Sequence, residues 1–294
     1  MYIIEYEQGE TCERGYAFFS KAWKEMEFHC VKLEEVCRQK DAEFLGILND
    51  IKYGRNLQNV IAYLENNQSS DLMEEAPYLV GTNAKADKIN QAHMRALDDK
   101  TEKKFYAIIE GDVTYEDIKN ISFAKQSLVV NVGAKVMLTA NDANGEYVNG
   151  TMGTIIDISK ERGDATCIQV LTDKGKKVDV YRYEREIERQ DIEERKENGE
   201  TVTVKKIVRK IVGSFKQFPI KIAWAMSIHK SQGQTFSQVN IDPQCWDSGQ
   251  FYVAVSRAES VARIHFMMPI RKQYIRTLSD EVIKILENSL KVIE

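Results

Sequence analysis

The chain has 294 residues, of which 43% are hydrophobic, so its length allows one large or two ordinary domains with a sizeable core. Its 41 basic and 45 acidic residues give a formal charge of −4, which excludes a global basic surface and requires any nucleic-acid surface to be local. The N-terminal residues lack the apolar segment of a signal peptide, no apolar run reaches the ~18 residues of a membrane span, and the five cysteines are scattered without a CxxC pair. These features predict a cytoplasmic protein with reduced thiols, no membrane partner and no zinc site.

The first quarter of the sequence favours helices. The pattern predicts helices over 15–28, 41–54 and 59–67, and a short strand over 29–39. In the helix over 41–54, Asp41 is a suitable N-cap and Gly54 is a suitable residue after the last turn. This region is therefore expected to begin an α/β domain.

An α/β unit follows between residues 76 and 97. The pattern predicts a strand over 78–80, a turn at Thr82 and Asn83, and a helix over 86–97. Open α/β sheets bind ligands at the carboxyl ends of their strands, so Thr82 and Asn83 are candidate binding residues, with Asn90 near them.

The pattern over residues 133–217 predicts a small all-β unit inserted between two α/β portions. The expected pieces are turns over 144–158, a hairpin over 167–187 with its turn at Asp173–Gly175, a charged loop or hairpin tip over 189–200, and a strand over 201–215.

Two groups of residues each allow a binding role and a structural role. A basic cluster in the β-rich unit is either a DNA-facing stripe or a solvated strand face, the second being favoured: Lys205, Lys206, Arg209 and Lys210. The tryptophans Trp23, Trp224 and Trp246 could stack on bases, but isolated tryptophans in apolar surroundings usually belong to the core.

The last part of the chain returns to an α/β pattern. The expected elements are a buried strand within 220–230 that leads into a polar turn, short strands over 239–242 and 263–268, a helix or strand–helix junction over 249–258, and an amphipathic helix over 279–293.

Two motifs in this last part carry most of the chemical information. Residues 225–236 read AMSIHKSQGQTF and place small polar donors on a glycine-bearing turn, which suits a phosphate or a nucleic-acid backbone. Residues 249–260 read GQFYVAVSRAES and place Arg257 after an apolar run, which suits a guanidinium aimed into a cleft. A second arginine, Arg38, precedes the expected helix start at Asp41, a position favourable to anions.

Together the two motifs resemble the late motifs of the superfamily 1 helicases, in the Pif-one/RecD-like branch (superfamily 1B). Other segments are similar to the same family in the same order, namely 16–54, YLVGTNAKADKINQAH at 78–93, GAKVMLTANDANGEYVNGTMG at 133–153 and GSFKQFPIKIAW at 213–224. The resemblance runs through nearly all of the chain and covers the later part of the family pattern.

The resemblance implies an α/β fold, namely the second RecA-like motor domain, of the P-loop-NTPase type, with an inserted SH3-like β-barrel. The implied divisions are a remnant of the first RecA-like domain (1–28), the first part of the second RecA-like domain (29–132), the inserted barrel (133–217) and the second part of the second RecA-like domain (218–294).

The resemblance also implies roles for individual residues. Arg257 would be an arginine finger that reaches the γ-phosphate of ATP, and Arg38 would be a second catalytic arginine. Gln39, Gln232 and Gly233 would lie at the nucleotide, with Gln39 either contacting it or orienting its segment. The residues implied to contact single-stranded DNA are Thr82, Asn83, His229, Lys230 and Ser231. Gln234 stands where many relatives have a small or apolar residue, so its role stays open, and no metal ligand is implied.

The implied function is ATP-dependent unwinding of DNA with 5′ to 3′ movement, with ATP and Mg²⁺ as cofactors of the complete enzyme. The sequence contains neither G-x-x-x-x-G-K-[ST] nor an apolar strand ending in an Asp–Glu pair, both of which belong to the first RecA-like domain of such enzymes. We therefore expect the second half of a helicase, which needs a first RecA-like domain as partner, binds neither cofactor tightly by itself and is inactive alone. Two other hypotheses remain: a non-catalytic nucleic-acid-binding or regulatory module, and a different P-loop enzyme.

Overall fold

The computed structural model describes residues 38–278 except 120, 122–124, 161–165 and 198–199, together with residues 25, 26, 36, 282 and 283. Within this range residues 99, 160 and 191–207 are described by their backbone alone. The helices expected over 15–28 and 279–293, and the strand expected over 29–39, lie wholly or mostly outside the described residues.

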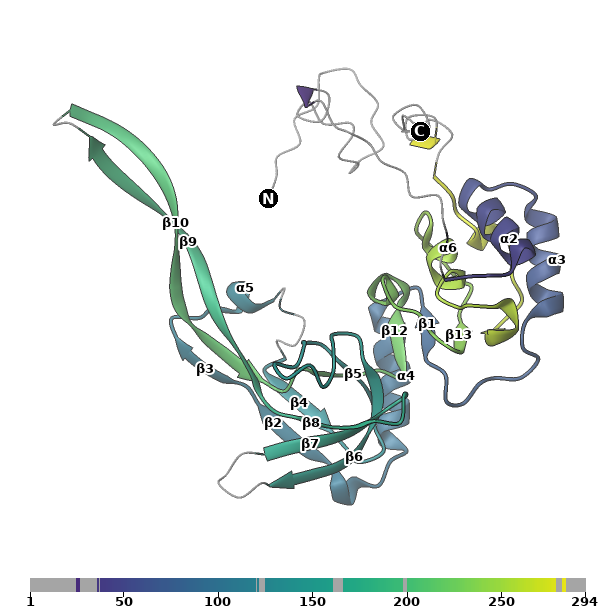
Figure 1. Cartoon of the computed structure of the whole chain (residues 1–294), viewed down its shortest axis with the longest axis horizontal. Helices are drawn as coiled ribbons and strands as arrows, with labels where there is room; N and C mark the ends of the chain where they lie inside the picture. The colour runs from purple at the N-terminus through teal and green to yellow at the C-terminus, as the bar shows by residue number, and fades with distance from the viewer. Residues whose placement is uncertain are drawn as a thin grey trace.

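A four-stranded parallel sheet forms the centre of the α/β part (Figure 1). In the order β12-β1-β13-β14, its strands are Ala225–Ser227, Tyr78–Val80, Val239–Ile241 and Ile264–Phe266. The registers place Val80 opposite Ser227 on one side of β1, and Leu79 opposite Ile241 on the other. Strands that are far apart in the sequence therefore end at the same edge of the sheet, as the resemblance to a RecA-like domain leads us to expect.

Helices cover both faces of this sheet. The principal helices are α2 (Ala42–Tyr53), α3 (Leu57–Asn67), α4 (Asn83–Arg95) and α6 (Gln250–Val255). Leu79 packs in one core cluster with residues of α2, α3 and α6, whereas Tyr78 and Val80 pack with Ala86 of α4, because alternate residues of a strand point to opposite faces. No helix in the described part of the chain is long and apolar enough to cross a membrane.

The ends of the helices follow from local capping. The Asp41 carboxylate accepts hydrogen bonds from the backbone N–H groups of Glu43 and Phe44, and Gly54 ends α2 with a φ of 68° in the left-handed region. The expected helix over 41–54 and strand over 78–80 are confirmed. Helix α4 begins earlier than the sequence indicates, because the Thr82 side chain accepts a hydrogen bond from Lys85 N and caps the helix there.

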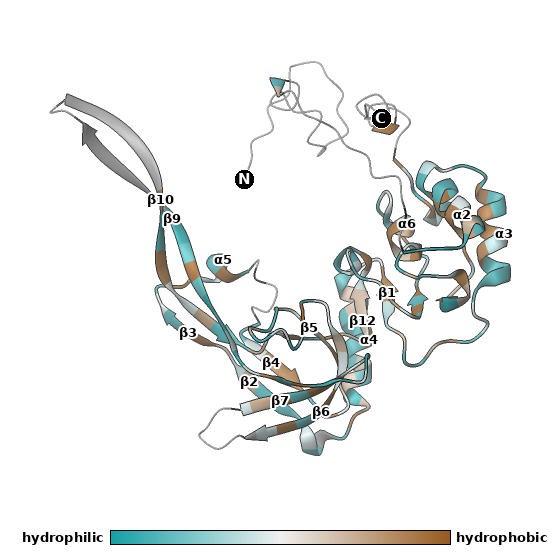
Figure 2. Cartoon of the chain, in the orientation of Figure 1, coloured by the Kyte–Doolittle hydropathy of each residue, from teal (hydrophilic) through white to brown (hydrophobic). Residues whose placement is uncertain are grey.

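The inserted β-unit is built on a five-stranded antiparallel sheet with the order β11-β5-β6-β7-β8. In that order its strands are Ile220–Ile222, Lys135–Leu138, Met152–Lys160, Thr166–Thr172 and Lys177–Val180. The expected turn at Asp173–Gly175 is confirmed, since β7 and β8 form a hairpin around it and Gly175 adopts a φ of 79°. Hydrophobic residues gather along the strands of this unit in Figure 2, whereas α3 presents many hydrophilic ones. Closure of the unit into an SH3-like barrel stays a prediction.

A long antiparallel ribbon extends away from the β-unit (Figure 1) and consists of β9 (Tyr183–Glu197) and β10 (Glu200–Gln217). The expectation of a charged loop or hairpin tip over 189–200 is wrong for most of that stretch, because β9 continues to Glu197 and its residue Arg189 pairs with Lys210. Acidic residues dominate β9 and basic residues dominate β10, and the Arg209 guanidinium lies 3.8 Å from the Glu188 carboxylate. This cross-strand pairing of charges favours the interpretation of the basic cluster as a solvated strand face.

Three short elements at the base of the ribbon carry no clear signal in the sequence. They are β2 (Lys103–Tyr106), which pairs with β4 (Ser127–Val130), β3 (Ile108–Gly111), which pairs with β10, and the short helix α5 (Tyr115–Ile118). Ile118 of α5 packs with Ile187 of β9 and Phe215 of β10 in a small core of their own.

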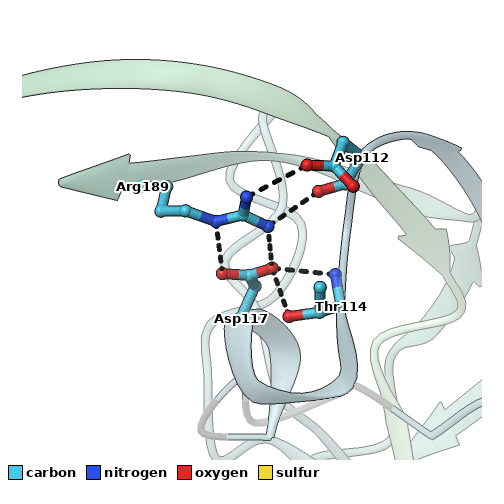
Figure 3. A network of polar contacts seen from close by, with 4 residues as sticks. All are labelled: Asp112, Thr114, Asp117 and Arg189. Atoms are coloured by element: carbon cyan, nitrogen blue, oxygen red, sulfur yellow. Dashed lines mark hydrogen bonds and ion pairs between the residues drawn. The ribbon is translucent and has the colours of Figure 1, made fainter. Parts of the chain in front are cut away.

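A polar network fixes α5 to the ribbon (Figure 3). The Arg189 guanidinium donates to the Asp117 carboxylate over 2.8 and 3.3 Å, to the Asp112 carboxylate over 3.0 Å and to the Asp112 carbonyl over 2.9 Å. The same Asp117 carboxylate accepts hydrogen bonds from the backbone N–H (2.8 Å) and hydroxyl (2.6 Å) of Thr114, which closes a capping box. We call these four residues the ribbon clamp.

Candidate functional site

Two polar segments lie side by side at the carboxyl edge of the parallel sheet. Strand β1 continues into Gly81, Thr82 and Asn83, and the neighbouring strand β12 continues into a 3₁₀ turn over Ile228–Ser231. The side chains of Thr82, Asn83, His229 and Lys230 are exposed there. The structure thus brings together four of the five residues that the sequence assigned to single-stranded DNA, on one open surface.

The fifth residue, Ser231, is completely buried, and its hydroxyl donates a 2.7 Å hydrogen bond to the Ile228 carbonyl. Asn90 is buried as well, and its amide group exchanges two 2.8 Å hydrogen bonds with the backbone of Ala225 in β12. Both side chains hold the backbone beneath the surface instead of facing solvent. The expected side-chain contact of Ser231 with nucleic acid therefore does not fit this geometry.

Positive charge collects near this surface although the whole chain is acidic. Burial lowers the pKa of Lys221 on β11, and the neighbouring ammonium groups of Lys230 and Lys125 lower that pKa further. One carboxylate lies close by, because Asp247 Oδ2 is 3.4 Å from His229 Nε2. The surface therefore has a basic side around Lys230 and an acidic residue beside His229.

Arg38, Gln39 and Arg257 converge on Ser256. The Ser256 carbonyl accepts hydrogen bonds from Arg38 Nη1 (2.8 Å) and from the Gln39 amide (3.0 Å), and the Ser256 hydroxyl accepts one from Arg257 Nη2 (3.0 Å). Two residues that lie more than two hundred positions apart in the sequence thus present their guanidinium groups at one place.

The two guanidinium groups have no counter-charge in the described part of the chain. Arg38 also donates to the Thr235 hydroxyl (2.9 Å), and Arg257 donates to the carbonyls of Val253 (2.9 Å) and Gln234 (3.2 Å). Burial lowers the pKa of Arg257, and the positive charge of Arg38 lowers it further. Such a pair of charges is costly without an anion and is suited to receive one.

The turn over Gln232, Gly233 and Gln234 connects the two groups of residues. Gln232 and Gly233 are exposed, and Gly233 adopts a φ of 83°. Gln234 accepts the hydrogen bond from Arg257, and its side-chain amide lies against Gly150 of the β-unit so closely that a Cβ at Gly150 would overlap it. Gln234, whose role the sequence leaves open, thus connects the turn, Arg257 and the β-unit.

Trp246 is a surface residue, although the sequence favours a core position over base stacking for it. Its side chain is 54% exposed, whereas Trp224 is 7% exposed and stacks on His93, as expected for a core residue. Trp246 follows β13 in the segment that reads DPQCWDSG. Its position after the end of a parallel strand, between polar and turn-forming residues, is the signal that could have identified it.

Potential metal-ligating side chains do not gather into a cluster among the described residues. No group of three or more His, Cys, Asp or Glu side chains within the described ranges could hold a metal ion. The buried carboxylate at the end of β13, Asp242, forms an ion pair with Lys85 of α4, so its charge is already matched.

Comparisons with known proteins agree with this architecture. No family model matches the chain. The ATP-dependent DNA helicase Pif1 of Bdellovibrio bacteriovorus is 31% identical over 260 residues, which cover 87% of this chain and 54% of that protein. The chain is a homologue of the Pif1 helicases. It spans about half the length of that Pif1 relative.

Solved Pif1 structures have the same fold. Unliganded Pif1 from Bacteroides sp. superposes with a TM-score of 0.71 at 27% identity, over 92% of this chain and 59% of that one. Bacteroides Pif1 in complex with ADP-AlF3 and ssDNA superposes with a TM-score of 0.66 at 25% identity, over 92% of this chain and 59% of that one.

Proposed function

We propose that this chain is the second motor part of an ATP-dependent DNA helicase and supplies it with an arginine finger and with contacts to single-stranded DNA. The Pif1 relatives support this function, since a Bacteroides Pif1 has been solved with a nucleotide analogue and ssDNA together. In this proposal the missing Walker-type phosphate loop and the Mg²⁺ ligands come from a first RecA-like domain, which closes on ATP together with this one.

The convergence of Arg38 and Arg257 on Ser256 is the observation that carries the proposal. A guanidinium has five N–H donors, and Arg257 spends three of them on Val253, Gln234 and Ser256. The remaining N–H donors of Arg257 and the positive charges of both arginines suit the γ-phosphate of ATP. Its negative charge must be stabilised while the phosphoryl group is transferred.

The second part of the proposal concerns DNA. The proposed contacts are exposed hydroxyl, amide, imidazole and ammonium groups, on Thr82, Asn83, His229 and Lys230. Such groups bind phosphates and do not distinguish one base from another. Binding should therefore tolerate any sequence and weaken as salt rises. The turn from Gln232 to Gln234 links these contacts to Arg257, so closure of the cleft on ATP would shift the grip on DNA. The 5′ to 3′ direction of movement is proposed from the resemblance alone.

The test uses the helicase that combines this chain with its phosphate-binding domain. Changing Arg257→Ala or Arg38→Ala should reduce the ATP turnover number by about 10³-fold or more while ATP binding changes little, since an arginine finger acts on the transition state. Turnover is measured by phosphate release and binding by a fluorescent ATP analogue. Lys40→Ala is the matched control, because Lys40 is an exposed cation beside Arg38 and Gln39. Wild-type turnover in either arginine variant would rule out the assigned role.

A further inference from the structure

We infer that Trp246 is a base-stacking residue, on which a base of single-stranded DNA packs between the two segments that hold the phosphates. The inference rests on the proposed function and extends it, because the DNA contacts proposed above are all with phosphates. The group that packs on the Trp246 ring is a nucleobase, and not a phosphate or a protein.

The ring is fixed by its polar edge. Trp246 Nε1 donates a 3.0 Å hydrogen bond to the Gly81 carbonyl, although the side chain is 54% exposed. A tryptophan at a protein surface usually buries its apolar body and leaves its N–H in water. Trp246 does the reverse, so much of the surface that it offers to solvent is the apolar aromatic body.

The backbone that carries the ring is also held in place. The buried side chain of Gln250 accepts a 3.0 Å hydrogen bond from Trp246 N and donates one of 2.9 Å to the same Gly81 carbonyl. Arg276 Nη1 donates to the Trp246 carbonyl over 2.8 Å. A ring anchored in this way loses little conformational freedom when a ligand packs on it, which favours binding.

Gly81 allows the ring to approach the strand end. A Cβ at Gly81 would lie 2.9 Å from the Gln244 carbonyl oxygen and 3.4 Å from Trp246 Cδ1. The first of these distances is shorter than a Cβ tolerates, so a glycine is needed where the Trp246 loop crosses the end of β1.

Trp246 lies between the two proposed phosphate contacts. Gly81, which holds the indole, immediately precedes Thr82 and Asn83. On the other side the ring centroid of His229 is 6.4 Å from that of Trp246, at an interplanar angle of 55°. A strand that places its phosphates on both segments would therefore bring its bases near this ring.

The ring itself favours a base over a phosphate, because it offers an apolar π-face and no cation. Asp247, the next residue, directs its carboxylate to the His229 imidazole, where Oδ2 lies 3.4 Å from Nε2. A nucleobase is uncharged, and each of the bases has a π-face that packs on an aromatic ring, regardless of the DNA sequence. Trp246 thus adds affinity without adding sequence preference.

The test compares two ligands of equal length and charge, a fluorescein-labelled oligothymidylate and the corresponding abasic oligonucleotide, each titrated into the full chain. Trp246→Ala should weaken binding to oligothymidylate by about ten-fold and leave binding to the abasic strand unchanged, because only the first ligand has bases to stack. Trp246→Phe should retain most of the affinity. It should also remove the part of the tryptophan fluorescence that oligothymidylate quenches, whereas the control variant Trp224→Phe should keep that quenching.

The other outcomes separate the inference from the proposed function. Unchanged affinity of Trp246→Ala for oligothymidylate would overturn the stacking role while leaving the phosphate contacts intact. Equal losses on both ligands would also overturn it, since they would mean a general disturbance of the surface. Failure of the wild-type chain to bind either ligand would overturn the proposed DNA contact itself. A His229→Ala/Lys230→Ala variant that loses affinity for both ligands alike would support the phosphate contacts independently.

Discussion

Gln39 is 3% exposed, and its amide nitrogen donates to the carbonyl oxygens of both Ser256 (3.0 Å) and Ala258 (2.9 Å). These carbonyls flank Arg257, so Gln39 holds the segment that carries Arg257 against the beginning of α2. Both amide hydrogens of Gln39 therefore bond to protein carbonyls. The sequence left two roles open for Gln39, orienting this segment or contacting the nucleotide, and these bonds favour the first.

Gln39→Leu should therefore lower the free energy of unfolding by about 1–3 kcal/mol, because the buried Ala258 carbonyl loses its side-chain donor. Urea denaturation followed by circular dichroism measures this change. The exposed Lys40 offers the control Lys40→Ala, for which we expect a change within about 0.5 kcal/mol. An unchanged urea midpoint for Gln39→Leu would contradict the positioning role.

The residue types of the site could be predicted from the sequence, but their burial could not. Lys230 and Ser231 are adjacent, yet the 3₁₀ turn exposes the first and buries the second. Trp246 is surface-exposed because its anchor is the carbonyl of Gly81, which lies in a distant part of the sequence. Exposure here depends on which remote segments meet, and local patterns carry little information about that.

At the scale of elements, the ribbon clamp gives the fold a response to acid. Hydrogen bonds from Arg189 and Thr114 hold the pKa of Asp117 well below its ordinary value of 3.8. A carboxyl group whose pKa is lowered by folding stabilises the protein fully when the pH is above the pKa of that group in the unfolded chain. This stabilisation is lost as the pH falls from the unfolded-state pKa to the folded-state pKa. The attachment of α5 to the ribbon should therefore weaken only in acid.

Asp117→Asn should lower the melting temperature at neutral pH, and the difference from wild type should shrink as the pH is lowered to about 3. Thermal unfolding of both proteins across this range is the measurement. Asp179→Asn, which changes an exposed carboxylate on β8, controls for the general effect of removing an acid. A difference that stays constant across the range would mean that Asp117 contributes no pH-dependent stability.

The elements that the sequence predicted well are those with clear apolar patterns and local signals at their ends. Helix α2 has one buried face, and strand β1 is buried on both faces. The ribbon was harder to predict because charged residues occur along almost the whole of β9, so the two-residue alternation of a half-buried strand is missing there. Its cross-strand charge pairs become apparent only when the register with β10 is known.

At the scale of the whole molecule, the prediction concerns what this polypeptide does alone. Its 294 residues contain no G-x-x-x-x-G-K-[ST], and the described ones form no metal site, so Arg38 and Arg257 have no bound phosphate to act on. The purified chain should release no phosphate from ATP above background with Mg²⁺ and single-stranded DNA present. A Pif1 helicase assayed in parallel provides the positive control. Robust Mg²⁺-dependent turnover by the chain alone would overturn this prediction.

The sequence predicts a β-rich unit between two α/β portions, and in the structure the strands of the five-stranded sheet lie between β1 and β12 along the chain. The limits of the unit were harder to predict, since its core also contains Leu128, Phe218 and Trp224, which lie outside 133–217. A hydrophobic core gathers whatever side chains the fold brings to it, so its edges need not coincide with a change in sequence pattern.

The position of the inserted unit has a consequence for how the chain folds. Strands β1 and β12 are hydrogen-bonded neighbours, yet about half of the chain separates them, including the whole β-unit. Bringing the ends of so long an unfolded loop together carries a large entropic cost and slows the formation of parallel pairs. If the β-unit collapses first, its ends are already close and that cost falls. We therefore expect the insert to form before the sheet, and the edge that bears Thr82 and His229 to form late.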